Sequence, residues 1–323
     1  MNFASNNFSV NGVSSGDNPE LENQHISGIN RMEPRSNLIP AHKKDVYYKN
    51  KEESVYLQSL NGDYKFAYML CDKCKEFYTE DFDDSNWDTI DVPSMWQYRG
   101  YGKCEYPNVE YPIPFNPPYI CRDNPVGYYR KKFQCNPDEK TILHFGGVDN
   151  AFYVYINGNF AGFSKGSRIP SEFDITPYIR RGENTIAVKV FSFSDGSYLE
   201  NQDMLMANGI FRDVYLLHTK KVSLSDFRFI SDEKGFDITI DLWEESSDFE
   251  VEISLDGKSS VFEAKKHIEA RFDLENPKFW NDEEPNCYDL YITIKKDGIP
   301  SEIHSKKIGI ISSEITGNKL LVN

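Results

Sequence analysis

The feature that most constrains the fold is a strict alternation of apolar and polar residues late in the chain. Apolar side chains take every second position in residues 236–242, 249–255 and 288–294. Successive side chains of a β-strand point to opposite faces, so this pattern predicts antiparallel strands with one buried face. Turn residues separate the runs, and no stretch keeps a helical period. This spacing indicates an immunoglobulin-like β-sandwich over residues 219–313.

Residues 51–218 also read as short strands separated by turns, but they are richer in aromatic residues and proline. Asn157–Gly158 lies between two apolar runs and predicts a tight hairpin, and Asn61–Gly62 is a second turn of this type. Closely spaced strands without a helical period predict another antiparallel sandwich. The predicted fold class is therefore all-β. Within residues 1–50, the opening to about Asp17 is rich in Asn, Ser and Gly and is expected to form a disordered leader.

Composition excludes several classes of function. The net charge of −15 argues against a nucleic-acid partner, because binding phosphate needs clustered basic residues. No apolar run could span a bilayer, and the first residues lack the features of a signal peptide. Six cysteines in 323 residues do not form a disulfide framework, and Cys71 and Cys74 lack a second metal-binding pair. We expect a cytoplasmic protein that contacts no membrane.

The most informative stretch is a polar segment between two apolar strands, residues 192–208. Polar loops on a rigid scaffold commonly carry function, and side-chain oxygens suit sugar hydroxyls or hard cations. The same residue types are also ordinary loop formers. Five acidic and amide side chains lie close together in this segment, those of Asp195, Glu200, Asn201, Gln202 and Asp203.

This segment, SDGSYLENQDM at 194–204, and the strand GIFRDVYLLH at 209–218 resemble family 2 glycoside hydrolases, specifically the long β-galactosidases. Further motifs agree in the same order along the chain, and they are QSLNGDYKFA (58–67), VPSMWQ (92–97), YPNVEYPIPFNPP (106–118), NPVGYY (124–129) and SRIPSEFD (167–174). Later agreement, in ENPKFWN (275–281) and EPNCY (284–288), is less specific.

The resemblance implies a jelly-roll, sugar-binding-like domain at residues 51–218 and a spacer domain at 219–313. It also implies an arm within residues 1–50 that helps in subunit contacts. Residues 314–323 resemble the first strand of a catalytic (β/α)8 barrel. Retaining glycosidases use two carboxylates, and in this family both are barrel glutamates. We therefore expect no catalytic residue in this chain and no hydrolysis by the chain alone.

The resemblance assigns substrate-contacting roles to two residues. Asn108 matches a family asparagine that reaches the galactose pocket, and Asp203 matches an aspartate that meets substrate and a sodium ion. An amide and a carboxylate suit hydroxyl recognition. Without the resemblance, Asn108 would be interpreted as a turn residue and Asp203 as a loop cap. Family enzymes use magnesium and sodium ions, of which this chain would hold at most a partial sodium site.

Asp195 and Asn18 match positions that can hold an additional divalent cation between the arm and the loop. Lys165 stands where the family has an uncharged amide, and Ser15 stands where it has an acid. An added ammonium and a lost carboxylate both weaken a cation site. One hypothesis is that the Lys165 ammonium replaces the ion by pairing with Asp195.

Several aromatic residues between positions 96 and 115 could stack on sugars, but aromatic residues in a β-sandwich are more often core. We expect a core position for most of this set, which comprises Trp96, Tyr98, Tyr106, Tyr111 and Phe115. Arg168 and Arg212 lie in strong motifs. They are expected to pair with acids such as Glu172 or Asp213 rather than to touch substrate.

Three functions are consistent with these observations. The first is the amino-terminal part of a β-galactosidase that hydrolyses galactosides such as lactose, joined to its catalytic barrel and expected to be a homo-oligomer. The second is a stand-alone carbohydrate-binding module. The third is a complementing subunit for a partner that bears the barrel. β-Glucuronidase and β-mannosidase share the architecture, but the motifs YPNV and SDGSYL favour a galactosidase.

Overall fold

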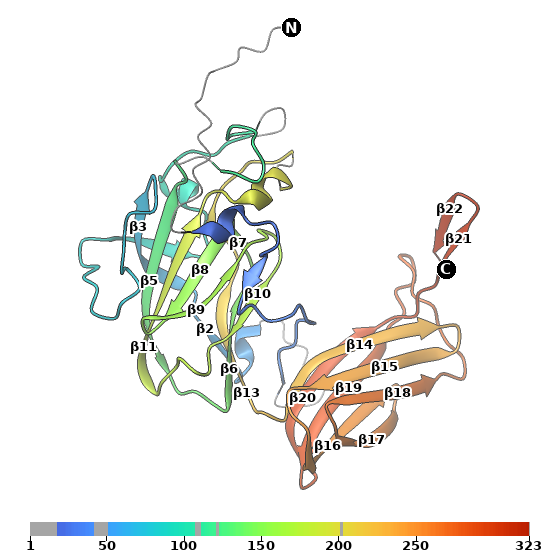
Figure 1. Cartoon of the computed structure of the whole chain (residues 1–323). Helices are drawn as coiled ribbons and strands as arrows, with labels where there is room; N and C mark the ends of the chain where they lie inside the picture. Colours follow the sequence, from blue (N-terminus) through green and yellow to red (C-terminus); the bar gives the residue numbers. More distant parts are fainter. Residues whose placement is uncertain (1–17, 42–50, 107–110, 121–122, 201–202, 323) are drawn as a thin grey trace. The chain divides into compact units, whose positions relative to one another are not determined.

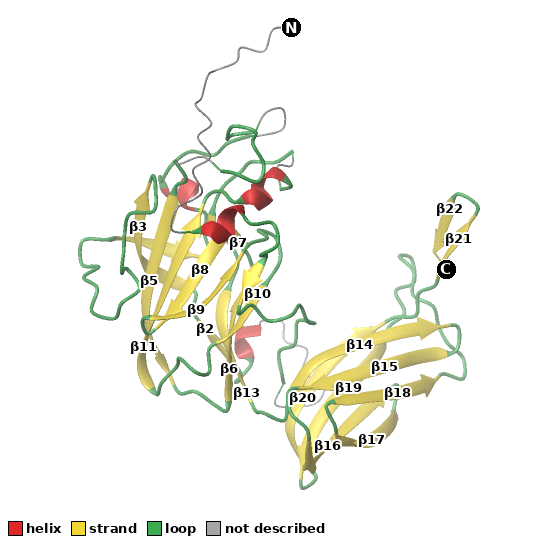
Figure 2. Ribbon diagram, in the orientation of Figure 1, coloured by secondary structure: helices red, strands yellow, loops and turns green. Residues whose placement is uncertain are grey.

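A computed structural model describes residues 18–41, 51–106, 111–120, 123–200 and 203–322. Figure 2 shows that strands dominate these ranges and that helical structure is limited to short turns. The turns are the 3-10 helices η1 (Pro19–Glu22), η2 (Lys51–Glu53), η3 (Trp96–Arg99) and η4 (Asp195–Tyr198). The all-β fold class predicted from the sequence is confirmed. None of the helices in the described part of the chain has the length and apolarity needed to cross a membrane.

Contacts group the described residues into two compact units. The first unit comprises residues 18–32, Leu60–Pro137 and Ile142–Tyr215. The second comprises residues 33–41, 51–59, Asp138–Thr141 and 216–322. Figure 1 labels most of the strands of both units.

The jelly-roll sandwich is built on two main antiparallel sheets. In spatial order, the larger sheet contains β1 (Gly28–Ile29), β9 (Asn159–Ser164), β8 (Ala151–Ile156), β11 (Gly182–Phe191), β5 (Val126–Cys135), β3 (Gly62–Met69) and β4 (Asp88–Val92). The smaller sheet contains β10 (Ser171–Asp174), β6 (Lys140–Phe145), β13 (Val214–Thr219) and β2 (Leu57–Ser59). A further pair joins β7 (Val148–Asp149) to β12 (Gly209–Ile210).

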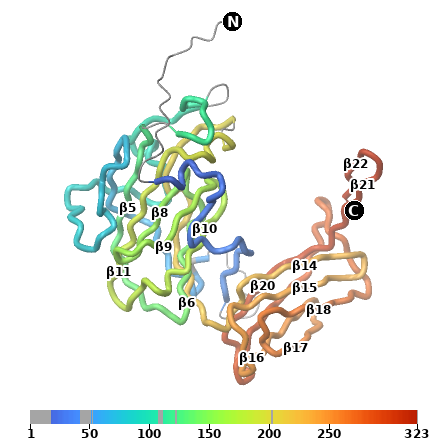
Figure 3. The backbone as a smooth tube through the Cα atoms, in the orientation of Figure 1, coloured from blue at the N-terminus to red at the C-terminus, as the bar shows by residue number. Residues whose placement is uncertain are grey.

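The central strands of the larger sheet are buried on both faces. Residues 184–191 of β11 are all buried, and this strand pairs with β5 on one side and with β8 on the other. Residues 186–191 are apolar except for Lys189, whose ammonium pairs with Asp72 at 2.7 Å. A strand covered on both faces shows such a nearly continuous apolar run rather than an alternation. The arm joins this sheet at its edge, where β1 pairs with β9, and Figure 3 shows this blue segment running past β9 and β10.

The hairpin predicted at Asn157–Gly158 joins β8 to β9. Asn157 has φ of 49° and Gly158 has φ of 79°. Two central residues with positive φ define the turn that matches the twist of two-residue hairpins, and asparagine and glycine tolerate it best. Local sequence therefore fixes this turn and, through it, the register of the two strands.

The immunoglobulin-like unit contains a three-stranded and a four-stranded sheet. The first is β14 (Leu224–Asp232), β15 (Gly235–Leu242) and β18 (His267–Asp273). The second, in spatial order, is β17 (Lys258–Ala264), β16 (Ser246–Leu255), β19 (Tyr288–Lys296) and β20 (Ile299–Ile308). The alternation in β15 has the predicted consequence, because Phe236, Ile238, Ile240 and Leu242 are buried.

The second half of the arm packs with the immunoglobulin-like unit. Leu38 belongs to its core, and the amide of Ser36 donates to Asp226 at 2.8 Å. The backbone of Ala41 donates to the carbonyl of Ile303 at 2.7 Å. The apolar pattern of the strands did not predict this division of the arm between two units.

A hairpin of β21 (Ser313–Thr316) and β22 (Lys319–Val322) ends the described part of the chain. Four of its apolar side chains are exposed, namely those of Ile315, Leu320, Leu321 and Val322. The sequence placed the start of a barrel hairpin at residues 314–323, and residue 323 lies outside the described residues.

Candidate functional site

The polar segment identified from the sequence leaves β11 and rejoins the sheets at β12. Its first part folds into η4, which begins at a reciprocal cap. The Ser194 hydroxyl accepts from the Gly196 amide at 3.2 Å, and the Ser194 amide donates to Ser197 Oγ at 3.0 Å. Such a cap satisfies amide groups that have no partner within the first helical turn. The serines of this segment therefore shape a defined turn.

Asp203 lies in an exposed position beside Tyr106, whose hydroxyl donates a hydrogen bond to its carboxylate. This bond raises the pKa of the Tyr106 phenol. Backbone hydrogen bonds between Glu105 and Met206 join the two segments, at 3.2 and 2.8 Å. The fold thus places the start of the YPNV motif against Asp203. Asn108 lies outside the described residues.

Asp149, on β7, is a buried carboxylate with two partners. Asn208 donates to it at 2.8 Å, and the Arg168 guanidinium pairs with its other oxygen. Arg168 also lies 3.2 Å from the sulfur of Met204, the residue after Asp203. Burial raises the pKa of Asp149 to about 6, although Arg168 favours the carboxylate. These contacts connect the second part of the segment, through Met204 and Asn208, to Arg168 and Asp149.

Glu200 holds the other part of the segment. Its Oε1 accepts from the amide of Ser167 at 2.8 Å, and its Oε2 accepts from the Ser167 hydroxyl at 2.6 Å and from the Asn150 amide at 3.1 Å. A carboxylate that accepts three hydrogen bonds within its own fold has little capacity left for a ligand. Glu200 is thus an anchor for the loop.

The predicted ion pair between Lys165 and Asp195 is present. The Lys165 ammonium lies 2.6 Å from Asp195 Oδ1, and each side chain is only 8% exposed. The same ammonium donates to the backbone carbonyls of Glu20 at 3.0 Å and Asn23 at 2.9 Å. An ammonium has three donors, so all of them are used. Lys165 therefore joins the arm to the loop through three oxygens.

Asn18 is bound elsewhere in the first unit. Its amide donates to Asp72 at 3.0 Å, and its oxygen accepts from Lys189 at 3.0 Å. Burial alone would raise the pKa of Asp72, but Lys189, 2.7 Å away, holds that pKa below its usual value. Asn18 and Asp195 are thus paired with different lysines.

The residues present do not fit a divalent cation between the arm and the loop. Asp195 Oδ1 and the arm carbonyls of Glu20 and Asn23 already accept from the Lys165 ammonium, whose positive charge would repel a cation at the same place. Among the residues that the structure describes, no group of three His, Cys, Asp or Glu side chains is placed to hold a metal ion. Ser15, the other departure from the family pattern, lies outside those residues.

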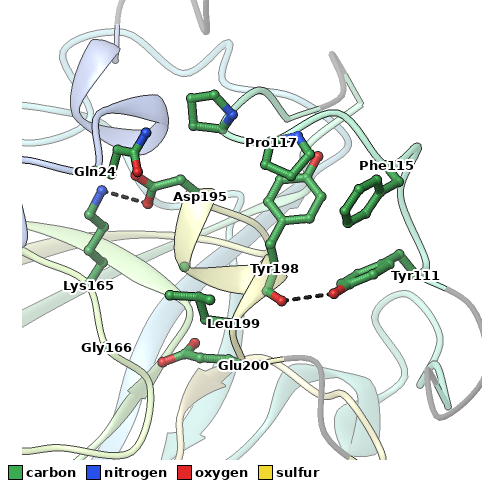
Figure 4. Close-up of a pocket in the computed structure, with 12 residues that line it drawn as sticks. Gln24, Tyr111, Phe115, Pro117, Lys165, Gly166, Asp195, Tyr198, Leu199 and Glu200 are labelled. Atoms are coloured by element: carbon green, nitrogen blue, oxygen red, sulfur yellow. Dashed lines mark hydrogen bonds and ion pairs between the residues drawn. The ribbon is translucent and has the colours of Figure 1, made fainter.

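A cavity of about 580 Å³ opens between the arm, the 111–118 segment and η4 (Figure 4). Its aromatic wall consists of Tyr111, Phe115 and Tyr198, and Lys165 and Asp195 lie on its polar side. Its volume falls within the usual range of ligand pockets, roughly 300–1,000 Å³. It is a second candidate site, built from residues other than Asp203.

Comparisons with known families match both units. Residues 57–220 match the description "Glycosyl hydrolases family 2, sugar binding domain", and residues 218–310 match "Glycosyl hydrolases family 2". The chain belongs to glycosyl hydrolase family 2. The resemblance inferred from the motifs is confirmed.

Curated relatives of this family member include two enzymes named β-galactosidase. The protein from Staphylococcus xylosus is 35% identical over 313 residues, which cover 94% of this chain and 31% of the relative. The protein from Clostridium acetobutylicum is 38% identical over 320 residues, which cover 90% of this chain and 35% of the relative. The chain therefore spans about a third of the length of the curated relatives it matches.

Solved structures of family 2 proteins share the fold. A β-glycosidase from Bacteroides vulgatus has a TM-score of 0.63 at 22% identity, covering 82% of this chain and 35% of that one. A Bifidobacterium dentium β-glucuronidase has the same TM-score at 15% identity, covering 83% of this chain and 50% of that one. At such identities the likeness establishes the architecture.

The expectation that the aromatic residues near position 100 are mostly core was wrong. Trp96 is fully buried, but Tyr98 is 60%, Tyr106 57% and Phe115 68% exposed. These three lie in or near segments that connect strands, where side chains are not forced to alternate between core and solvent. Exposed aromatic rings are available for ligand contact.

Arg168 pairs with a buried acid, as predicted, but the acid is Asp149 rather than Glu172 or Asp213. Arg212 instead donates to the backbone carbonyls of Gly146 and Arg168, at 3.3 and 2.9 Å. Glu172 binds His144 at 2.9 Å. Charge alone cannot select among many acids, because pairing depends on which strands the topology brings together.

Asp149, Asn208 and Tyr198 were not predicted from the sequence to belong to the site, although Tyr198 lies within the SDGSYL motif. The Tyr198 hydroxyl donates to the carbonyl oxygens of Pro114 and Tyr119, at 3.1 and 2.6 Å. A tyrosine surrounded by glycine, serine and acidic residues in a loop needs a packing partner for its ring. This local pattern could have indicated Tyr198 as a structural residue of the site.

Proposed function

We propose that this chain provides the amino-terminal, non-catalytic part of a β-galactosidase, the activity that acts on terminal β-galactosides such as lactose. One observation carries the proposal. The likeness to proteins named β-galactosidase extends over 94% of this chain but over only 31% of the relative from Staphylococcus xylosus. On this proposal, the catalytic glutamates belong to the remaining two thirds of the enzyme, and the chain alone does not hydrolyse galactosides.

Asp203 is proposed to contact the galactoside, together with Asn108. Its carboxylate is exposed and accepts a hydrogen bond from the Tyr106 hydroxyl through one oxygen, so it retains acceptor capacity for sugar hydroxyls. The same carboxylate is proposed as one ligand of a sodium ion, with the other ligands supplied outside this chain. Because the Lys165 ammonium binds Asp195, no magnesium ion is proposed at the arm. A cytoplasmic location and a homo-oligomeric enzyme are part of the same proposal.

A chimera tests this function. The segment of the Staphylococcus xylosus β-galactosidase that matches this chain is replaced by this chain, and hydrolysis of a nitrophenyl β-galactoside is measured. We expect activity from the chimera and none from the chain alone. Asp203→Ala is expected to lower kcat/KM of the chimera about tenfold or more, the loss of roughly one charged hydrogen bond.

The control is Asp248→Ala, which removes an exposed carboxylate on β16 in the immunoglobulin-like unit. It is expected to leave kcat/KM unchanged. Equal activity of Asp203→Ala and Asp248→Ala would contradict the role of Asp203. A folded chimera without hydrolysis, or turnover by the pure chain, would contradict the proposed function as a whole.

A further inference from the structure

Asp203 lies on a short exposed stretch, residues 203–205, that is attached to the segment before the YPNV motif. Its carboxylate accepts from the Tyr106 hydroxyl, and the backbone of Met206 bonds that of Glu105, at 2.8 and 3.2 Å. Tyr106 is 57% exposed, and a hydrogen bond between exposed groups competes with water and adds little rigidity on its own. The direction of the Asp203 carboxylate therefore depends on how the rest of the stretch is held.

Arg168, in the connection from β9 to β10, supplies a second attachment. Its Nη2 lies 3.2 Å from the sulfur of Met204, the residue that follows Asp203. Its Nη1 pairs with the carboxylate of Asp149. The Asp149 side chain is only 4% exposed, whereas the Arg168 side chain is 36% exposed. The guanidinium thus joins a buried, fixed charge to a residue of the exposed stretch.

The neighbours of this guanidinium fix its orientation. Its central carbon lies 5.4 Å from the centroid of the Phe211 ring. Asp149 lies opposite Gly209 in the β7–β12 pair, and its other oxygen accepts from Asn208 at 2.8 Å. Arginine suits such a position because its planar group donates in two directions at once, whereas a lysine ammonium is a compact point charge. The side chain therefore reaches Met204 from a preset direction.

We propose that Arg168 is a positioning residue for Asp203. Asp149 holds its Nη1, its Nη2 holds Met204, and the Asp203 carboxylate is thereby directed toward the galactoside. This inference rests on the proposed contact between Asp203 and that sugar, and it assigns the residue that orients the contact. Arg168 acts through Met204 and does not touch the substrate.

Hydrogen exchange of the Met206 amide measures how firmly the stretch is held. This amide donates to the Glu105 carbonyl at 2.8 Å, so it exchanges when the stretch opens. Arg168→Lys keeps a positive charge for Asp149 but removes the forked donor, and Met204→Leu removes the sulfur at similar volume. We expect each variant to speed exchange at Met206 about threefold or more, the effect of losing roughly one hydrogen bond. The double variant should add little to either single change.

Arg180→Lys is the matched control. Arg180 donates to both oxygens of Glu80 in another forked pair, whose side chains are 53% and 42% exposed. This substitution is expected to leave exchange at Met206 unchanged. Exchange is compared along the whole chain, because a general loss of stability speeds it throughout the first unit. Loss of positioning speeds it only around residues 203–208.

The β-galactosidase chimera gives the functional readout. Arg168→Lys and Met204→Leu are expected to lower its kcat/KM about threefold or more. Neither should lower kcat/KM further in the Asp203→Ala background, because the positioned carboxylate is then absent. A merely structural role would lower it in both backgrounds.

Unchanged exchange at Met206 in Arg168→Lys would overturn the positioning role. The same holds for an unchanged kcat/KM in an active chimera, and for a further loss when Arg168→Lys is added to Asp203→Ala. A chimera without activity contradicts the proposed function instead. In that case exchange at Met206 in the chain itself still decides whether Arg168 holds the stretch.

Discussion

Replacing Lys165 with methionine isolates the energetic role of the arm-to-loop contact. The substitution keeps the approximate volume but removes three donated hydrogen bonds, to Asp195 and to the carbonyls of Glu20 and Asn23. It leaves the Asp195 carboxylate, 8% exposed, without its positive partner. Removing one member of a buried ion pair costs roughly 3–5 kcal/mol. A loss of that size lowers Tm of a domain of this length by about 6–20 °C.

Thermal unfolding followed by circular dichroism measures this loss, and limited proteolysis reports release of the arm. The matched control is Lys132→Met, in a pair with Glu183 at 3.0 Å whose side chains are 63% and 54% exposed. Exposed pairs contribute about 0–1 kcal/mol, so this control is expected to change Tm little. A double variant that also replaces Asp195 with leucine should cost less than the sum of the two single changes. Equal effects of the two lysine substitutions would refute the argument.

Three further predictions concern ions, pH and backbone geometry. Because an ammonium holds the arm, neither millimolar magnesium nor a chelator should change Tm of the chain. In Lys165→Gln, by contrast, Tm should rise when magnesium is added. Calorimetric scans with and without the ion measure both. The folded-state pKa of Asp149, about 6, exceeds that of an unfolded aspartate, so the folded protein binds more protons between these values and its free energy of unfolding falls as pH rises through that window. Asp149→Asn should remove this component, which amounts to about 1.3 kcal/mol of the free energy of unfolding between pH 5 and pH 7, as measured by urea titrations at these two pH values. Gly209→Ala should destabilise the first unit by roughly 1–3 kcal/mol. Gly209 has φ of +129°, and a Cβ there would lie 2.8 Å from the Ser94 carbonyl oxygen. An unchanged midpoint of urea unfolding would contradict this prediction.

Local sequence predicted the elements of this fold well because their signals are local. The alternation of residues 236–242 requires only that one face be buried, and it produced β15. The Asn157–Gly158 turn requires only two residues that tolerate positive φ, and it produced the β8–β9 hairpin. Neither signal depends on which distant strand lies alongside.

The site was harder to predict because its contacts join segments far apart in sequence. The Lys165–Asp195 pair was predictable because the family resemblance assigned both residues to the same candidate cation site. The hydrogen bond from Tyr106 to Asp203 spans 97 residues, and the bond from Lys165 to the Glu20 carbonyl spans 145. A backbone carbonyl carries no sequence signature, so no residue type announces it as a partner. The cavity itself is a property of several such contacts acting together.

The contacts of Tyr198 have a consequence for how this surface can change during evolution or engineering. Its hydroxyl meets the backbone of Pro114, Asn116 and Tyr119 rather than their side chains. A backbone atom is present whatever residue occupies the position, so the segment can exchange many side chains without losing its attachment. Tyr198 itself cannot be exchanged in this way. The attachment of the segment and the side chains it displays are thereby determined by different residues, and a library that varies residues 115 and 119 while keeping Tyr198 should retain folded proteins.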